Sequence, residues 1–340
     1  MQNDLTVFIG TFADRFFSMT FDRETLEAEN LHAICNPAGR SAFFALSSDA
    51  EYLYVANEFQ AGAGSVAAFR LVSGEDPLFL NAIETGSQGP AHISMINCFG
   101  RDYLLGSGYF EGDIMVWPLS EDGRLLPMSE NFRLPEGAHA HGIRPIPGTS
   151  FVLATDTGHG LIYTYELTPE GKLIQRHCFS DKALEAPRHM TFSKDGGRVF
   201  VVTERTSTLE VFTINRENGE LIHTHHFNNL PDDFTGESSS AAIHISPDGQ
   251  YVYCSNRGHD SLTVYHIEKE KITKVGCVHE SIRWPREFLI DPEGTFLLVG
   301  NQLDESVSVF RINRTNGMPE FSGKKISLSE GPACFTCVSH

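Results

Sequence analysis

One pattern of residues recurs along the whole chain: a short apolar strand, a turn of the Ser-Pro-Asp-Gly type, a second apolar strand and then a third. It is clearest in residues 189–204 and 242–257, and further copies begin near positions 43, 92, 141, 287 and 334. The copies are about 48 residues apart, and self-similarity at a fixed period of this length is typical of repeat proteins. Seven such periods account for all 340 residues, so we expect seven copies of one β-rich unit.

The seventh copy is divided between the two ends of the chain. Residues 334–338 supply one apolar strand of this copy, and residues 7–11 supply another. A ring that shares one unit between its termini leaves no long sheet edge exposed, and exposed edges promote aggregation. The sequence therefore predicts an all-β fold: a seven-bladed β-propeller with four-stranded antiparallel blades, its last blade closed by strands from both termini.

The regular spacing leaves no domain boundary, so residues 1–340 are predicted to form a single domain. The longest interval, from position 189 to 242, carries an insertion at residues 228–240 that we interpret as a surface loop. A parallel β-helix is the alternative architecture, but its repeats are usually much shorter.

Composition limits the class of partner and the compartment. The chain has 26 Lys and Arg against 44 Asp and Glu, a formal net charge of -18, whereas nucleic acids and anionic membranes attract a basic face. No apolar run approaches the roughly 18 residues of a membrane span, and residues 1–4 do not begin a secretory signal. The seven cysteines are scattered, without the spacing of a disulfide framework. We expect a reduced cytoplasmic protein that binds neither nucleic acid nor membrane; no feature indicates an oligomeric state.

The repeat also predicts which residues share one mouth of the central channel. If the first strand of each blade is innermost and the second is antiparallel to it, the start of the first strand and the end of the second lie together. Reading these positions from each copy collects many ionisable groups, together with Gln302: they are His92, His141, His189, Arg188, Arg257, Arg286, Glu58, Asp156, Glu204 and Glu287. A mouth so rich in ionisable side chains is a candidate site, although charged groups at a channel mouth can also be simply solvated.

Several short segments connect these positions with a known family. They are Val7-Phe8-Ile9-Gly10-Thr11, Ala56-Asn57-Glu58, Gly89-Pro90-Ala91-His92, His139-Ala140-His141, Ala186-Pro187-Arg188-His189, Thr203-Glu204, Ser255-Asn256-Arg257-Gly258-His259, Trp284-Pro285-Arg286, Gly300-Asn301-Gln302 and Gly331-Pro332. In their joint order, which spans essentially the whole chain, they resemble the seven-bladed lactonases. That family includes a type of 6-phosphogluconolactonase and the eukaryotic carboxy-cis,cis-muconate lactonising enzyme.

The resemblance implies an enzyme without a cofactor, acting on a small anionic lactone or sugar acid. By this resemblance the catalytic groups are His141, Arg188, Glu204 and Arg257. The other expected substrate-binding residues are Glu58, His92, His139, Asp156, His189, Arg286 and Gln302.

Lactone hydrolysis needs an activated water, a cation at the developing oxyanion and residues that bind the anionic group of the substrate. Glu204 or His141 could take the proton of the water. Arg188 and Arg257 could stabilise the oxyanion and bind the anion. The same groups could instead run a cycloisomerisation, and a propeller that binds a metabolite or partner without catalysis is a further alternative.

Metal sites are not expected. Cys334 and Cys337 lie three apart on a strand and should point to opposite faces. The run His223-Thr224-His225-His226 fits a solvated outer strand better than a metal site. His139 and His141 could hold zinc together with Asp156 or Glu204, but the neighbouring arginines disfavour a cation there.

Overall fold

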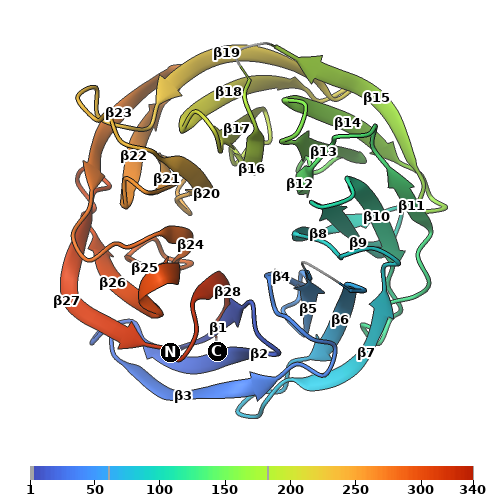
Figure 1. Ribbon diagram of the computed structural model, residues 1–340, viewed down its shortest axis with the longest axis horizontal. Coiled ribbons are helices and arrows are strands. Elements are labelled where there is room, and N and C mark those ends of the chain that lie inside the picture. Colours follow the sequence, from blue (N-terminus) through green and yellow to red (C-terminus); the bar gives the residue numbers. More distant parts are fainter. Residues whose placement is uncertain (1–3, 60–61, 182–183, 340) are drawn as a thin grey trace.

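The computed structural model describes residues 4–59, 62–181 and 184–339, which form seven four-stranded antiparallel sheets. The sheets stand as blades around a central channel, with the two ends of the chain side by side (Figure 1). The prediction of an all-β, seven-bladed propeller is therefore confirmed. In the described ranges the only helix is the short 3₁₀ turn η1 (Gln302–Asp304), and no helix is long and apolar enough to cross a membrane. Residues 1–3, which entered the argument about a secretory signal, lie outside the described residues.

Each blade runs outward from the channel in sequence order, apart from the blade shared by the termini. The innermost strands are β4 (Phe43–Leu46), β8 (His92–Cys98), β12 (Ala140–Pro145), β16 (Pro187–Phe192), β20 (Ser239–Ile245), β24 (Pro285–Ile290) and β28 (Pro332–Ser339). The second strands are β1 (Asp4–Thr11), β5 (Tyr52–Asn57), β9 (Arg101–Gly108), β13 (Phe151–Asp156), β17 (Arg198–Thr203), β21 (Tyr251–Arg257) and β25 (Phe296–Asn301). The third strands are β2 (Arg15–Asp22), β6 (Ser65–Arg70), β10 (Asp113–Pro118), β14 (Leu161–Leu167), β18 (Thr208–Asn215), β22 (Ser261–Glu268) and β26 (Ser306–Ile312). The outermost strands are β3 (Ala28–Cys35), β7 (Leu78–Glu84), β11 (Glu130–Arg133), β15 (Leu173–Ser180), β19 (Glu220–Asn228), β23 (Lys271–Val278) and β27 (Pro319–Ser327).

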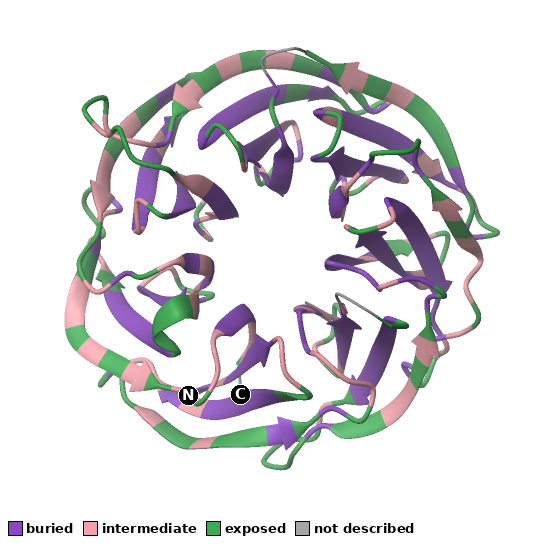
Figure 2. Ribbon diagram, viewed as in Figure 1, coloured by how far each residue is buried: buried purple, intermediate pink, exposed green. Residues whose placement is uncertain are grey.

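Burial falls from the channel side of each blade to its rim. Every residue of β25 is buried, because both faces of the second strand pack against neighbouring blades, whereas exposure alternates along β19 at the rim (Figure 2). The core is accordingly a set of clusters between blades. In one of them Phe21 of β2 packs against Phe296 of β25, with ring centroids 4.8 Å apart.

The termini close the ring as predicted. Strand β28 pairs antiparallel with β1 from Leu5↔Ser339 to Gly10↔Cys334. The strands approach so closely at Gly10 that a Cβ there would lie 2.3 Å from the Cys334 sulfur and 2.4 Å from the Ser41 carbonyl oxygen. Only glycine fits this point of closure.

The registers place the strand ends that build the site. Pro187 pairs with Thr203 and Ser239 pairs with Arg257, so the starts of β16 and β20 lie beside the ends of β17 and β21. At the opposite end of β20, the turn at residues 246–249 closes through Asp248, whose Oδ1 accepts hydrogen bonds from Ser246 Oγ and the Gln250 amide. Ionisable strand ends and hairpin turns thus occupy opposite ends of the channel.

Candidate active site

A cavity of about 400 Å³ opens at the end of the channel where first strands start and second strands end. Its lining residues are Phe12, Arg40, Glu58, Phe59, Ala91, Tyr109, Phe110, His141, Arg188, Glu204, Arg257, Arg286 and Gln302. This set brings together the four predicted catalytic residues and three of the predicted substrate-binding residues.

The lining follows a structural rule that the blades share. The residue immediately after the second strand faces the cavity in five blades, as Phe12, Glu58, Tyr109, Glu204 and Gln302, and Arg257 ends the second strand of a sixth. The first strands contribute residues at or near their starts, namely Ala91, His141, Arg188 and Arg286. The register shifts at the starts of β12, β16 and β24, and such bulges re-aim side chains.

Glu204 is held between two arginines from neighbouring segments of the rim. Its Oε1 lies 2.5 Å from Nη2 of Arg257, and its Oε2 lies 3.7 Å from Nε of Arg188. Burial raises the pKa of Glu204, but the Arg188 and Arg257 guanidinium groups lower it by more, so that the net shift is downward. The carboxylate is therefore ionised at neutral pH.

Arg188 is the most deeply buried cation of the site, with 2% of its surface exposed. Its Nη1 donates a hydrogen bond to the Ala241 carbonyl, whereas its buried Nε has no hydrogen-bond partner. Burial, followed by repulsion from Arg257, lowers the pKa of Arg188 to about 9, which leaves it a cation at neutral pH. A buried guanidinium with a free N–H is a donor available to an anionic ligand.

His141 lies at the inner side of the same cavity. Its ring contacts Tyr109 and His189 edge-on, at centroid distances of 5.5 and 5.0 Å, and its buried Nδ1 lacks a hydrogen-bond partner. Burial, with Arg188 next in importance, holds the pKa of His141 well below its ordinary value. The ring is consequently neutral.

Glu58 is the second carboxyl group of the cavity, and its environment differs from that of Glu204. Burial raises the pKa of Glu58, and the charges of Arg286, Arg188 and Arg40 offset this only in part.

Two further arginines rest on aromatic rings at the wall of the cavity. The guanidinium carbon of Arg286 lies 4.7 Å from the centroid of Phe12, and that of Arg40 lies 5.7 Å from the centroid of Phe59. Cation–π contacts of this kind hold an arginine in place while its N–H groups remain available.

His92 and His189 do not line this cavity. They line a second one, of about 540 Å³, further along the channel, together with Arg144, His244 and Glu287. Arg188 lines the first cavity and His189 the second, at the register shift between Pro187 and Met190. There His244 Nε2 lies 2.7 Å from a carboxylate oxygen of Glu287, and His189 Nδ1 lies 3.7 Å from the other.

The predicted placement of Asp156 at the mouth is corrected by the structure. Asp156 pairs with Ala140 inside the sheet and is fully buried. Its carboxylate accepts hydrogen bonds from the amides of His139 and Gly158 and contacts the His159 ring at 2.8 Å, so that it shapes the loop. His141 lies five residues before the turn at Ile146, whereas His189 lies four before the turn at Ser193, so a count of fifteen from His141 ends at Asp156, one residue short of Thr157.

His139 also lies outside the main cavity. Its ring stacks on Tyr109 at 4.6 Å, its Nδ1 lies 2.8 Å from the Tyr109 carbonyl oxygen, and it lines an adjoining pocket at the rim.

Five residues that line the cavity were not predicted from the sequence: Phe12, Arg40, Phe59, Tyr109 and Phe110. Phe12 and Tyr109 would have been found by counting from the end of each second strand. Arg40 lies three positions before β4, in a loop that the repeat does not describe.

The metal alternative considered for this region has no matching geometry. In the part of the chain that the structure describes, His139 and His141 form no ligand cluster with Asp156 or Glu204. His223 and His226 instead contact the two carboxylate oxygens of buried Glu210, at 2.8 and 2.7 Å. Cys334 and Cys337 pack in different core clusters, as expected for opposite faces of a strand.

Comparisons with known proteins agree with this architecture. Residues 6–338 match the family model described as Lactonase, 7-bladed beta-propeller. The chain is 29% identical over 325 residues to a 6-phosphogluconolactonase of Bacillus subtilis (strain 168), which covers 91% of this chain and 92% of the relative. It is 27% identical to a 6-phosphogluconolactonase of Formosa agariphila, covering 90% and 92% of the two chains. Among solved structures, the periplasmic gluconolactonase PpgL of Pseudomonas aeruginosa superposes with a TM-score of 0.89 at 23% identity, over 99% of both chains.

Proposed function

The chain belongs to the lactonase family of seven-bladed β-propellers, which makes it a lactone-hydrolysing enzyme, and on that premise we propose that it hydrolyses an anionic sugar lactone, 6-phosphogluconolactone, in the cavity at the channel mouth. Relatives that carry the name 6-phosphogluconolactonase support this choice of substrate.

The observation that carries the proposal is the charge of the cavity wall. Arg40, Arg188, Arg257 and Arg286 face two carboxylates, Glu58 and Glu204, in a chain whose formal net charge is -18. Such a local excess of guanidinium groups favours a ligand with anionic oxygens, and arginine binds phosphate and carboxylate in a bidentate geometry. A sugar lactone with a phosphate outside its ring presents anionic oxygens in addition to its ester carbonyl, which matches a wall whose cations are spread over several blades.

Glu204 suits the role of general base better than His141. When Glu204 takes a proton from water, the carboxylate becomes neutral and a negative charge appears on the lactone oxyanion. Arg188 and Arg257 can stabilise the negative charge both on Glu204 and on the oxyanion. A proton on His141 would instead add a buried cation beside Arg188, which the strongly lowered pKa of His141 shows to be unfavourable. We assign the base role to Glu204 and the positioning of water or substrate to neutral His141.

The reaction then proceeds in two steps. Water oxygen attacks the lactone carbonyl carbon as Glu204 accepts a proton from the water, and Arg188 and Arg257 stabilise the oxyanion. The intermediate collapses by breaking the bond to the ring oxygen, which receives the proton from Glu204. The product is the open-chain acid, which ionises at neutral pH. Arg40 and Arg286, fixed on Phe59 and Phe12, bind the phosphate of the substrate.

The test compares hydrolysis of 6-phosphogluconolactone with that of unphosphorylated gluconolactone. We expect a higher kcat/KM for the phosphorylated substrate, and an Arg40→Ala variant should lose about 10–100-fold in kcat/KM for that substrate alone, the equivalent of a charged hydrogen bond. Arg314→Ala, which removes an exposed arginine outside the cavity, serves as the matched control. Equal rates with both lactones would refute the substrate assignment.

A further inference from the structure

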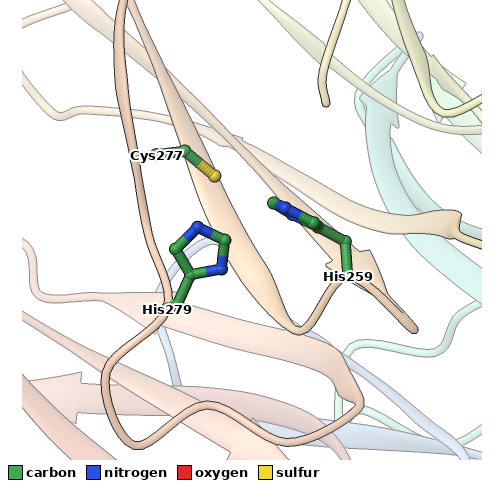
Figure 3. Close-up of side chains that lie close together, drawn as sticks. All are labelled: His259, Cys277 and His279. Carbon is green, nitrogen blue, oxygen red and sulfur yellow. The ribbon is translucent and has the colours of Figure 1, made fainter. Parts of the chain in front are cut away.

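Three side chains of soft or borderline metal-binding character converge beside the rim of the blade that carries Arg257. They are His259 in the loop between β21 and β22, Cys277 on β23, and His279 just after β23. One ligand atom from each lies within 4.8 Å of the other two, and the two imidazole centroids are 4.4 Å apart. Figure 3 shows the Cys277 thiol and the two rings directed toward one another.

The antiparallel register explains why residues eighteen positions apart meet. Leu262 near the start of β22 pairs with Val278 at the end of β23, so the loop before β22 and the segment after β23 lie at the same edge of the blade. This is the edge at which β21 ends with Arg257, two residues before His259.

The surroundings of His259 fix one ring nitrogen and leave the other available. Its Nδ1 lies 2.7 Å from Oγ of Ser261, a fully buried residue. Histidines that ligate metals almost always use one nitrogen for the metal and give the other N–H to a second-shell acceptor, which orients the ring. Nε2 of His259 is therefore the atom that a metal would take.

The donor set selects the metal. One thiolate and two imidazoles suit Zn²⁺, whereas Ca²⁺ and Mg²⁺ require oxygen ligands. Zinc with bonds of about 2.0–2.3 Å needs ligand atoms roughly 3.3–3.8 Å apart in a tetrahedron. His279 is exposed, and rotation of its side chain can close the remaining difference.

We propose that His259, Cys277 and His279 form a Zn²⁺ site with one coordination position open to water, separate from the lactone cavity. Binding releases the thiol proton of Cys277 and ties the loop between β21 and β22 to the outer strand β23. None of the three ligands lines the cavity, so this proposal stands independently of the proposed function.

The experiment titrates chelator-treated protein with Zn²⁺ by calorimetry and with Co²⁺ by absorption spectroscopy. We expect one equivalent of tight binding and, for Co²⁺, a thiolate-to-metal charge-transfer band. Cys277→Ser should abolish the band and weaken Zn²⁺ binding by at least ~100-fold, and Ser261→Ala should weaken it by ~10–100-fold through the lost second-shell contact. Cys178→Ser, which changes an exposed cysteine on β15, is the matched control and should bind as the parent protein does.

If Cys277→Ser does not fold, Zn²⁺ binding is measured in His279→Ala instead, and it should be weakened in the same way. This variant is expected to fold because His279 is exposed and lies outside the core. The proposal is overturned if the parent protein takes up no Zn²⁺, if the folded Cys277→Ser or His279→Ala variant binds it unchanged, or if Cys178→Ser loses it.

Discussion

Nη2 of Arg257 lies 2.5 Å from Oε1 of Glu204, although the two residues are 53 positions apart and belong to neighbouring blades. The contact exists because each residue stands at the end of its blade's second strand, and closure of the ring brings those ends to one rim. A carboxylate held this way is ionised, oriented and within the field that would stabilise an oxyanion.

Glu204→Gln should lower kcat by about 10²–10⁴-fold with little change in fold, since the amide oxygen can still accept a hydrogen bond from Arg257 but cannot take a proton. His141→Gln should cost less, because the neutral ring positions rather than transfers protons. Steady-state kinetics of both variants, with thermal unfolding as the check on folding, make the comparison. Glu217→Gln, at an exposed turn, is the control. A larger loss in His141→Gln than in Glu204→Gln would assign the base role to His141.

The acid limb of the pH profile should report Glu204. Burial raises the pKa of Glu204, but Arg188 and Arg257 lower it by more, so the net pKa lies below the ordinary 4.5. We therefore expect kcat/KM to be maintained until the pH falls below the lowered pKa of Glu204. Arg257→Gln removes one cation and raises the pKa of Glu204, which should move the acid limb to higher pH. An acid limb that does not move in Arg257→Gln would show that another group is the base.

Glu58→Gln should stabilise the protein at neutral pH but not in acid. Burial raises the folded-state pKa of Glu58, so the folded chain holds this proton more tightly than the unfolded chain. This tighter proton binding stabilises the folded parent protein at pH values below the unfolded-state pKa of Glu58, and the stabilisation is lost as the pH rises through the folded-state pKa. The glutamine side chain stays neutral at every pH, so the variant does not lose stability in this way. Thermal unfolding should give a higher Tm than the parent at pH 7 and a similar Tm at pH 4. An unchanged Tm at pH 7 would contradict this account of Glu58.

Closure of the ring can be tested at Gly10. A methyl group there would meet Cys334 and the Ser41 backbone, so Gly10→Ala should force β28 away from β1 and destabilise the fold by about 1–3 kcal/mol or more. Thermal unfolding of Gly197→Ala gives the comparison, since the nearest atom to a Cβ at Gly197 is 3.4 Å away. Equal Tm values in the two variants would mean that the junction tolerates repacking.

The fold could be predicted from the sequence because each copy of the repeat corresponds to one blade. Residues 242–257 contain the first strand, the turn and the second strand of one blade, and the antiparallel register follows from that order. The divided copy predicted closure by β28 and β1 for the same reason.

The site was predicted in part, where spacing within the repeat was regular. Glu204 and Arg257 were placed correctly at the rim, because the hairpins of their blades keep the same length. Asp156 was misplaced although its hairpin has the same length, because His141 lies five residues before the turn at Ile146, whereas His189 lies four before the turn at Ser193. Tyr109 was missed because β9 has eight residues and β17 has six, so the end of the second strand comes later in that blade. Arg40 comes from a connecting loop, whose path depends on packing against Phe59 and not on the repeat.

The most direct test of the account is a crystal structure of the Glu204→Gln variant with 6-phosphogluconate, the product of the proposed reaction. We expect the carboxylate of this ligand within about 2.7–3.2 Å of Arg188 and Arg257, and its phosphate at Arg40 and Arg286. A ligand seated in the second cavity beside Arg144 and Glu287, or a mouth cavity without ligand in crystals of a variant that binds it in solution, would contradict the account.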